Sequence, residues 1–93
     1  MAARTTGTVS LGDLLKRGTL QAPETLVIRR RSAPDIEGRV ESDGNIRVDR
    51  AVYATPSAAA KHVLGVGSVD GWLRWRVPRL DGKTLAELRE GDG

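Results

Sequence analysis

The period of apolar residues changes several times along the chain, and each change predicts an element of secondary structure. In "VSLGDLLKRG" the leucines recur at helical spacing. Ser10 and Asp13 have the spacing of a capping box at the start of this run, and Gly18 supplies a left-handed stop at its end. The pattern predicts a short helix between Ser10 and Gly18.

From Thr25 the apolar period becomes two, which is typical of a strand. In "TLVIRRR" leucine and isoleucine alternate with the residues between them. The segments "DIEGRVES" and "NIRVDR" repeat the alternation on both sides of an Asp-Gly dipeptide at residues 43 and 44, which is a strong hairpin signal. A last short run at Val52 and Tyr53 completes a β-rich half.

Helical spacing returns in "TPSAAAKHVLG", where Ser57 can cap a helix that ends at Gly65. A shorter helix closes the chain in "DGKTLAELRE", with Thr84 and Glu87 as its capping box. The order of elements predicts an α+β fold: a single small domain with an antiparallel sheet of about four to five strands, covered on one side by two or three short helices.

The stretch from Trp72 to Val77 lies between a glycine and a proline and has the usual length of a strand. Alternation on that strand would point Trp75 into the core and Trp72 to the polar side, beside Arg74 and Arg76. Two explanations of Trp72 stay open. It covers a hydrophobic edge while Arg74 stacks on it, or it belongs to a surface where the indole stacks on a nucleic-acid base.

The composition narrows the classes of function. The chain has no cysteine and one histidine, which excludes disulfides and leaves too few ligands for a zinc site. No apolar run approaches the roughly 18 residues of a membrane span, and the start "MAARTTGTVS" lacks the apolar core of a signal peptide. We therefore expect a cytoplasmic protein. The glycines of "GVGSVDG" do not open a helix after a strand, and no cofactor is expected.

The basic residues are unusual in kind more than in number. The net charge is only +3, but twelve of the 15 basic residues are arginines, which suit bidentate contact with phosphate and guanine. A GC-rich genome, which favours arginine codons, explains the same excess. Composition leaves both explanations open.

Several segments together resemble a known family. They are "SLGDLLKRGTL", "ETLVIRRR", "VESDGNIRVD", "YATPSAAAKHVLG", "GWLRW" and "DGKTLAELR". In this combination the chain resembles the RAMA domain, which is associated with restriction enzymes and adenine methylases. The matching motif residues are Thr55, Pro56, Ser57, Gly71, Trp72 and Trp75. The resemblance covers residues 9–90, after an arm of residues 1–8 that we expect to be flexible.

The resemblance implies a small α+β module that binds DNA, with a role in sensing modified adenine, N6-methyladenine in particular. Family members are commonly tails of a catalytic domain. No catalytic domain accompanies the module in these 93 residues, so we expect either an excised domain or a free-standing binder. Double-stranded DNA is the expected partner, and a methyltransferase or nuclease is a second one.

The candidate residues follow from where the basic side chains would lie. Arg29 and Arg31 project from one side of their strand and would form one basic surface with Arg74 and Arg76 if the two strands are neighbours. The helix start at Ser57 would offer backbone N–H groups to a phosphate, with Lys61 one turn along. The predicted DNA-binding residues are Arg29, Arg31, Ser57, Lys61, His62, Trp72, Arg74 and Arg76. The plainer alternatives are a solvated strand face, a helix cap and a solvated histidine.

No catalytic or metal-binding group is predicted. Ser57, His62 and Asp70 contain the residue types of a nucleophilic triad, but a serine before a run of alanines is typical of a helix cap. Carboxylates lie singly in turns and caps. The alternative to DNA binding is a protein–protein interaction module that docks on a methyltransferase, a nuclease or itself, with Trp72 and Arg74 at its centre.

Overall fold

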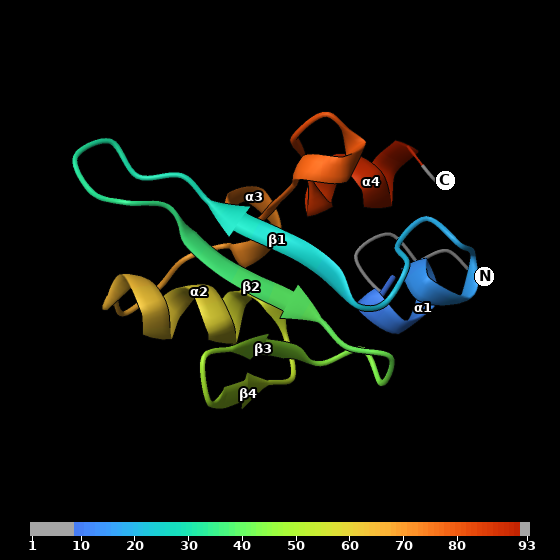
Figure 1. Cartoon of the computed structure of the whole chain (residues 1–93), viewed down its shortest axis with the longest axis horizontal. Coiled ribbons are helices and arrows are strands. Elements are labelled where there is room, and N and C mark those ends of the chain that lie inside the picture. Colours follow the sequence, from blue (N-terminus) through green and yellow to red (C-terminus); the bar gives the residue numbers. More distant parts are fainter. Residues whose placement is uncertain (1–8, 92–93) are drawn as a thin grey trace.

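The computed structural model describes residues 9–91 and has one antiparallel sheet with helices packed on one of its faces (Figure 1). The helices are α1 (Leu11–Lys16), α2 (Pro56–Leu64), α3 (Gly71–Arg74) and α4 (Leu85–Gly91), with a 3₁₀ turn η2 (Pro78–Leu80). The strands are β1 (Glu24–Ile28), β2 (Ile36–Val40), β3 (Ile46–Val48), β4 (Ala51–Tyr53), β5 (Arg76–Val77) and β6 (Lys83–Thr84).

The strand order is β4-β3-β2-β1-β5-β6, and every neighbouring pair is antiparallel. The predicted α+β class is confirmed. Residues 9–91 contain six strands and four helices, slightly more than predicted. The two residues of β6 are too few to leave an alternating pattern, and the single turn of α3 falls where a strand was predicted. The predicted arm of residues 1–8 lies outside the described part of the chain.

The strand register separates a covered face from an open one. Leu26 lies opposite Gly38 and faces the helices, whereas Thr25 lies opposite Arg39 and faces solvent. We call the solvent side of the sheet the open face. Its residues, by register and exposure, are Thr25, Val27, Glu37, Arg39, Arg47, Val52 and Arg76.

Local signals at the two ends of the chain are confirmed. The Ser10 backbone N–H donates to Asp13 Oδ2 at 3.0 Å, and the Asp13 N–H donates back to Ser10 Oγ at 3.2 Å. The hydrogen bond from the Ser10 backbone lowers the pKa of Asp13. Thr84 and Glu87 form the same reciprocal pair before α4, at 2.8 and 3.1 Å, and the backbone hydrogen bond from Thr84 lowers the pKa of Glu87.

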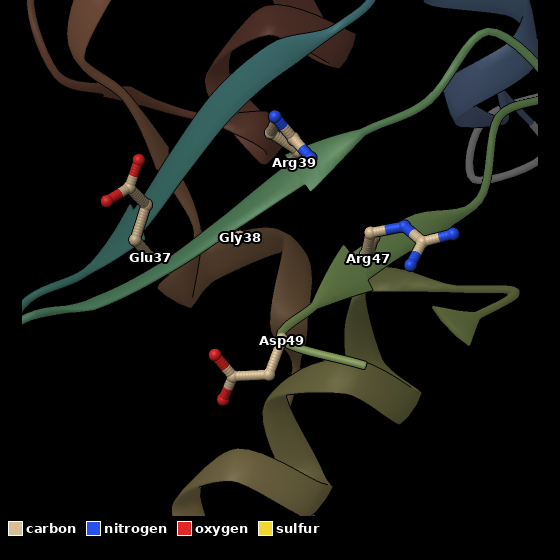
Figure 2. A pocket seen from close by; sticks show the side chains of 5 residues that line it. All are labelled: Glu37, Gly38, Arg39, Arg47 and Asp49. Carbon is tan, nitrogen blue, oxygen red and sulfur yellow. The ribbon is translucent and has the colours of Figure 1, made fainter. Parts of the chain in front are cut away.

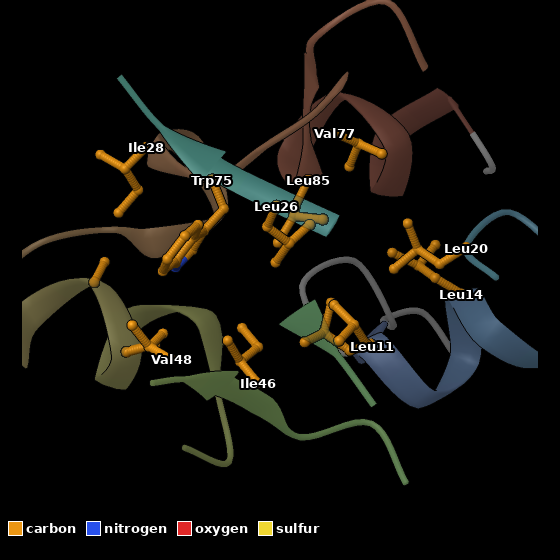
Figure 3. Packing of buried hydrophobic residues seen from close by; sticks show 13 residues of the cluster. Leu11, Leu14, Leu20, Leu26, Ile28, Ile46, Val48, Trp75, Val77 and Leu85 are labelled. Carbon is orange, nitrogen blue, oxygen red and sulfur yellow. The ribbon is translucent and has the colours of Figure 1, made fainter. Parts of the chain in front are cut away.

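The core lies between the covered face and the helices, with Trp75 at its centre (Figure 3). Trp75 is fully buried, as predicted, and Figure 3 shows it among Leu26, Ile28 and Val48. Space for the indole comes from Gly38. A Cβ on Gly38 would lie 3.2 Å from the Trp75 ring and 3.1 Å from a Val48 methyl group.

An ion pair between a buried carboxylate and a partly exposed arginine fixes the start of β1. Glu24 is 3% exposed, and Arg79 from η2 donates to both of its carboxylate oxygens at 2.7 to 3.2 Å. The Gln21 N–H also donates to Glu24 at 2.9 Å. Burial raises the pKa of Glu24, but the hydrogen bonds from Arg79 and Gln21 outweigh it, and the pKa lies below its ordinary value. The Arg79 guanidinium is therefore engaged in an intramolecular ion pair that stabilises the fold.

Candidate nucleic-acid interface

The start of α2 differs from the sequence prediction in its cap. Thr55 is the N-cap, and its hydroxyl accepts from the Ala58 N–H at 3.1 Å. Ser57 stands one residue inside the helix, after Pro56, so the prediction that Ser57 caps α2 is wrong. Proline at the first helical position carries no N–H that would need a partner, which moves the cap to the residue before it. The predicted stop at Gly65 is confirmed, with φ of 67°.

Instead of capping α2, Ser57 helps to join it to α3. Ser57 Oγ accepts from the Gly71 N–H at 2.9 Å, and the Pro56 carbonyl accepts from the buried Trp75 Nε1 at 3.1 Å. A Cβ on Gly71 would overlap the Pro56 carbonyl, so only glycine permits this approach. We call Pro56, Ser57, Gly71 and Trp75 the α2–α3 lock. The two halves of the family-like motif thus contact each other.

The predicted strand from Trp72 to Val77 is wrong over its first half. Residues 71–74 form a single helical turn, and the Asp70 side chain caps it by accepting from the Trp72 N–H at 3.0 Å. Only Arg76 and Val77 are in a strand. The lock explains the difference, because the chain must turn sharply to bring both Gly71 and the Trp75 ring onto Pro56.

Trp72 consequently does not share a strand face with Arg74. It is half-buried, and the guanidinium of Arg89 in α4 lies 4.3 Å from its ring centroid. A cation–π contact therefore exists at Trp72, but with Arg89 instead of the expected Arg74. Sequence reasoning could not find Arg89, because α4 reaches α3 only through the tertiary fold.

The four strand arginines of the prediction are dispersed. β1 and β5 are neighbours, as the prediction required, with Val27 opposite Arg76. Arg29 and Arg31 lie beyond the end of β1, exposed in the loop 29–35 that projects from one end of the sheet in Figure 1. Arg74 is half-buried in α3. Arg76 remains on the open face and donates to the Gly82 carbonyl at 3.0 Å.

Lys61 and His62 are exposed on α2. The His62 ring lies against Tyr53 of β4, with centroids 5.5 Å apart. Lys61 lines a hollow of about 310 Å³ together with the start of α2 and the loop before α3. The members of that hollow are Thr55, Ser57, Ala58, Lys61, Gly67, Ser68 and Val69.

Two arginines that the sequence prediction did not select face each other on the open face. Arg39 of β2 lies directly opposite Arg47 of β3. Their side chains are 53% and 46% exposed, and the carboxylate of Glu41 lies near both. The signal was present in the sequence, because the register that places apolar Val40 opposite apolar Ile46 also pairs residue 39 with residue 47.

The arginine pair borders a hollow of about 270 Å³ over β2 and β3 (Figure 2). Figure 2 shows the charges divided across it: the guanidinium groups of Arg39 and Arg47 lie on one side and the carboxylates of Glu37 and Asp49 on the other. The open face is therefore polarised. An anionic ligand would be attracted to the arginine side and repelled from the carboxylate side.

A metal site and a membrane span each set requirements that can be compared with residues 9–91. This part of the chain contains no group of three or more histidine, cysteine, aspartate or glutamate residues that could hold a metal ion. It also contains no helix with the length and apolar character needed to cross a bilayer.

A sheet with one face covered by helices, one open face and a helix-to-helix lock defines a small α+β module. The family model for Restriction Enzyme Adenine Methylase Associated (RAMA) proteins matches residues 1–91. The chain belongs to the RAMA family, and the resemblance found in its motifs is confirmed. This membership associates it with restriction-modification adenine methylases. No curated protein matches the chain.

Proposed function

We propose that this chain is a non-catalytic DNA-binding module of the restriction-modification type, and that it distinguishes duplexes that carry N6-methyladenine. The observation that carries the proposal is the Arg39 and Arg47 pair on the open face. Like charges directly across an antiparallel pair are unfavourable. The Glu41 carboxylate offsets this repulsion at 3.6 and 3.9 Å, without a close hydrogen bond, so an anion that binds more closely would be favoured. A sugar-phosphate backbone supplies that anion, and arginine is well suited to bind it.

The structure changes which predicted residues we assign to the interface. Ser57 accepts a hydrogen bond from the Gly71 N–H, and the Trp72 ring is covered by the Arg89 guanidinium, so both side chains already make contacts that stabilise the fold. The proposed interface therefore centres on Arg39 and Arg47, with Arg76 farther along the open face. Arg29, Arg31, Lys61, His62 and Arg74 remain candidates for outer contacts.

The methyladenine part of the proposal rests on family membership, because the family is associated with adenine methylases. A flipped base would need an aromatic side chain to stack on. The two candidates, Tyr53 and Trp72, are both half-buried, and Tyr53 lies opposite Ile46 on the covered side of the sheet, so a base that stacks on either would have to reach past the open face.

The test is fluorescence anisotropy with two labelled duplexes, one unmodified and one with N6-methyladenine, at two salt concentrations. Arg39→Ala/Arg47→Ala should weaken DNA binding about tenfold to hundredfold. It should also reduce the slope of log affinity against log salt concentration by about two, because two phosphate contacts are lost. The control, Lys16→Ala/Lys83→Ala, removes the same charge from other exposed positions and should change affinity less than about threefold.

Two results would contradict the proposal in different ways. Equal losses in both double variants would mean that net charge alone attracts DNA. Equal affinity for the two duplexes would remove the methyladenine part and leave a general DNA-binding module.

A docking role is the second candidate, and Leu73 favours it. This side chain is 58% exposed on α3, between Trp72 and Arg74. An exposed leucine beside a half-buried tryptophan and an arginine has the composition of an interaction hot spot. Sedimentation of the chain with a restriction-modification methyltransferase, with and without Leu73→Ser, distinguishes this role, because such a complex would persist at high salt.

A further inference from the structure

Glu41 stands between the two opposed arginines without forming a close hydrogen bond to either. Its Oε2 lies 3.6 Å from Arg39 Nε and 3.9 Å from Arg47 Nε. Charge-assisted hydrogen bonds between guanidinium and carboxylate normally measure about 2.7 to 2.9 Å. The carboxylate therefore offsets the repulsion between the arginines, but it does not use their full capacity to donate.

The position of this oxygen marks where the two guanidinium groups favour negative charge. Carboxylate and phosphate oxygens are recognised by arginine in the same way, commonly through two parallel N–H donors. A backbone phosphodiester carries one negative charge, like a carboxylate, but its two non-bridging oxygens diverge from a tetrahedral phosphorus, so one oxygen could face each arginine.

We propose that the pair of Arg39 and Arg47 is a binding site for one phosphate group, and that Glu41 is a built-in competitor for that site. Binding requires the Glu41 side chain to move aside. The proposal rests on the proposed function, since the DNA backbone is the source of the phosphate. A free phosphate has the same chemistry, and the experiments below separate the two.

The backbone around Glu41 permits this movement. Its N–H donates to the Asn45 carbonyl at 2.8 Å, and its carbonyl accepts from the Gly44 N–H at 2.9 Å. These bonds hold the β2–β3 turn and do not involve the side chain. The Glu41 side chain is 35% exposed, so it can rotate into solvent without breaking the turn.

The deciding variant is Glu41→Gln, with Glu37→Gln as the matched control. Glu37 lies within β2 and Glu41 directly follows it, so alternation places both on the side of Arg39, and each variant removes one negative charge. Glu37 lies across the hollow from the arginines (Figure 2). We expect Glu41→Gln to tighten binding of a 16-base-pair duplex about fivefold or more at about 0.15 M salt, where charges beyond about 8 Å are screened. Glu37→Gln should change it less than about twofold.

Equal gains in the two variants would overturn the competitor role, because net charge would then explain both. Absence of any gain in Glu41→Gln would overturn it as well. The double variant Arg39→Ala/Glu41→Gln should bind the duplex more weakly than Glu41→Gln alone, because the tighter binding of Glu41→Gln depends on Arg39.

A second readout uses inorganic phosphate and no DNA. The Nε–Hε resonances of Arg39 and Arg47 should shift on phosphate addition, at a lower phosphate concentration in Glu41→Gln than in the wild type. A shift without duplex binding would retain the phosphate site and overturn the DNA-binding function. Duplex binding that is unaffected by Arg39→Ala/Arg47→Ala, with no phosphate-induced shift, would overturn the site and place the DNA interface elsewhere.

Discussion

Gly71 shows how one residue can determine a local fold. Its missing side chain lets the Pro56 carbonyl approach the backbone of α3, and the same carbonyl accepts the Trp75 indole N–H. The atoms that a Cβ on Gly71 would meet belong to the backbone of Pro56 and Ser57, so no flexible side chain could move to make room for it. The tight approach therefore depends on the absence of a single Cβ.

Gly71→Ala should lower the free energy of unfolding by about 3 kcal/mol, because the added Cβ overpacks against a carbonyl group. Urea denaturation followed by tryptophan fluorescence measures this loss. Gly67→Ala is the matched control, since a Cβ there has open space within 4 Å, and its effect should stay within about 0.5 kcal/mol. Similar stabilities of the two variants would contradict the proposed steric cause.

Glu24 predicts a pH dependence of stability. Its pKa lies below the ordinary 4.5, so the ionised carboxylate stabilises the fold above that pH. This contribution should decrease as the pH falls from about 4.5 through the lower folded value. Glu24→Gln should lower the free energy of unfolding by about 1 to 3 kcal/mol at pH 7, because the substitution weakens the buried acceptor of the Arg79 hydrogen bonds.

Denaturation from pH 7 to pH 2 measures the difference between wild type and Glu24→Gln, which should shrink as the pH falls. Asp13 and Glu87 also have lowered pKa values, but they titrate in both proteins and cancel in the comparison. A difference that stays constant with pH would show that Glu24 contributes through packing alone.

At the scale of elements, the α2–α3 lock predicts that Ser57 matters for stability and not for DNA. Ser57→Ala removes the acceptor of the Gly71 N–H and should lower the free energy of unfolding by about 1 kcal/mol. DNA affinity should change less than about twofold. Chemical denaturation and anisotropy on the same protein measure both. A loss of affinity without a loss of stability would return Ser57 to the interface.

Elements with a local signal were predictable from the sequence. The capping boxes of α1 and α4, the Asp-Gly turn of β2 and β3, and the glycine stop of α2 all lie within a few residues of the structure they define. α3 was not predictable as a helix, because one turn has no apolar period and its conformation follows from the contact with Pro56. Local pattern determines an element only where distant contacts agree with it.

The candidate site was only partly predictable for a related reason. Arginines in a run, such as Arg29 to Arg31, attract notice in the sequence, yet they lie in a loop. Arg39 and Arg47 are separated by eight positions and become neighbours only through the register of the hairpin. The cation–π partner of Trp72 is Arg89 and not Arg74, because α4 packs on α3.

At the scale of the whole molecule, the size of the domain limits its footprint. Its longest dimension is 42 Å, and one turn of duplex DNA measures about 34 to 36 Å. The open face can therefore follow about one turn of duplex at most. The 16-base-pair probe exceeds this length and provides a complete binding site.

The lengths of the outermost strands have a consequence for behaviour at high concentration. β4 and β6, at the two edges of the sheet, contain three and two residues, and Lys83 is exposed on β6. Short edges offer few free backbone groups to a strand of another molecule, and β6 also carries the charge of Lys83, so edge-to-edge association and fibril growth are disfavoured. The molecule can thus leave a whole sheet face uncovered and still remain dispersed.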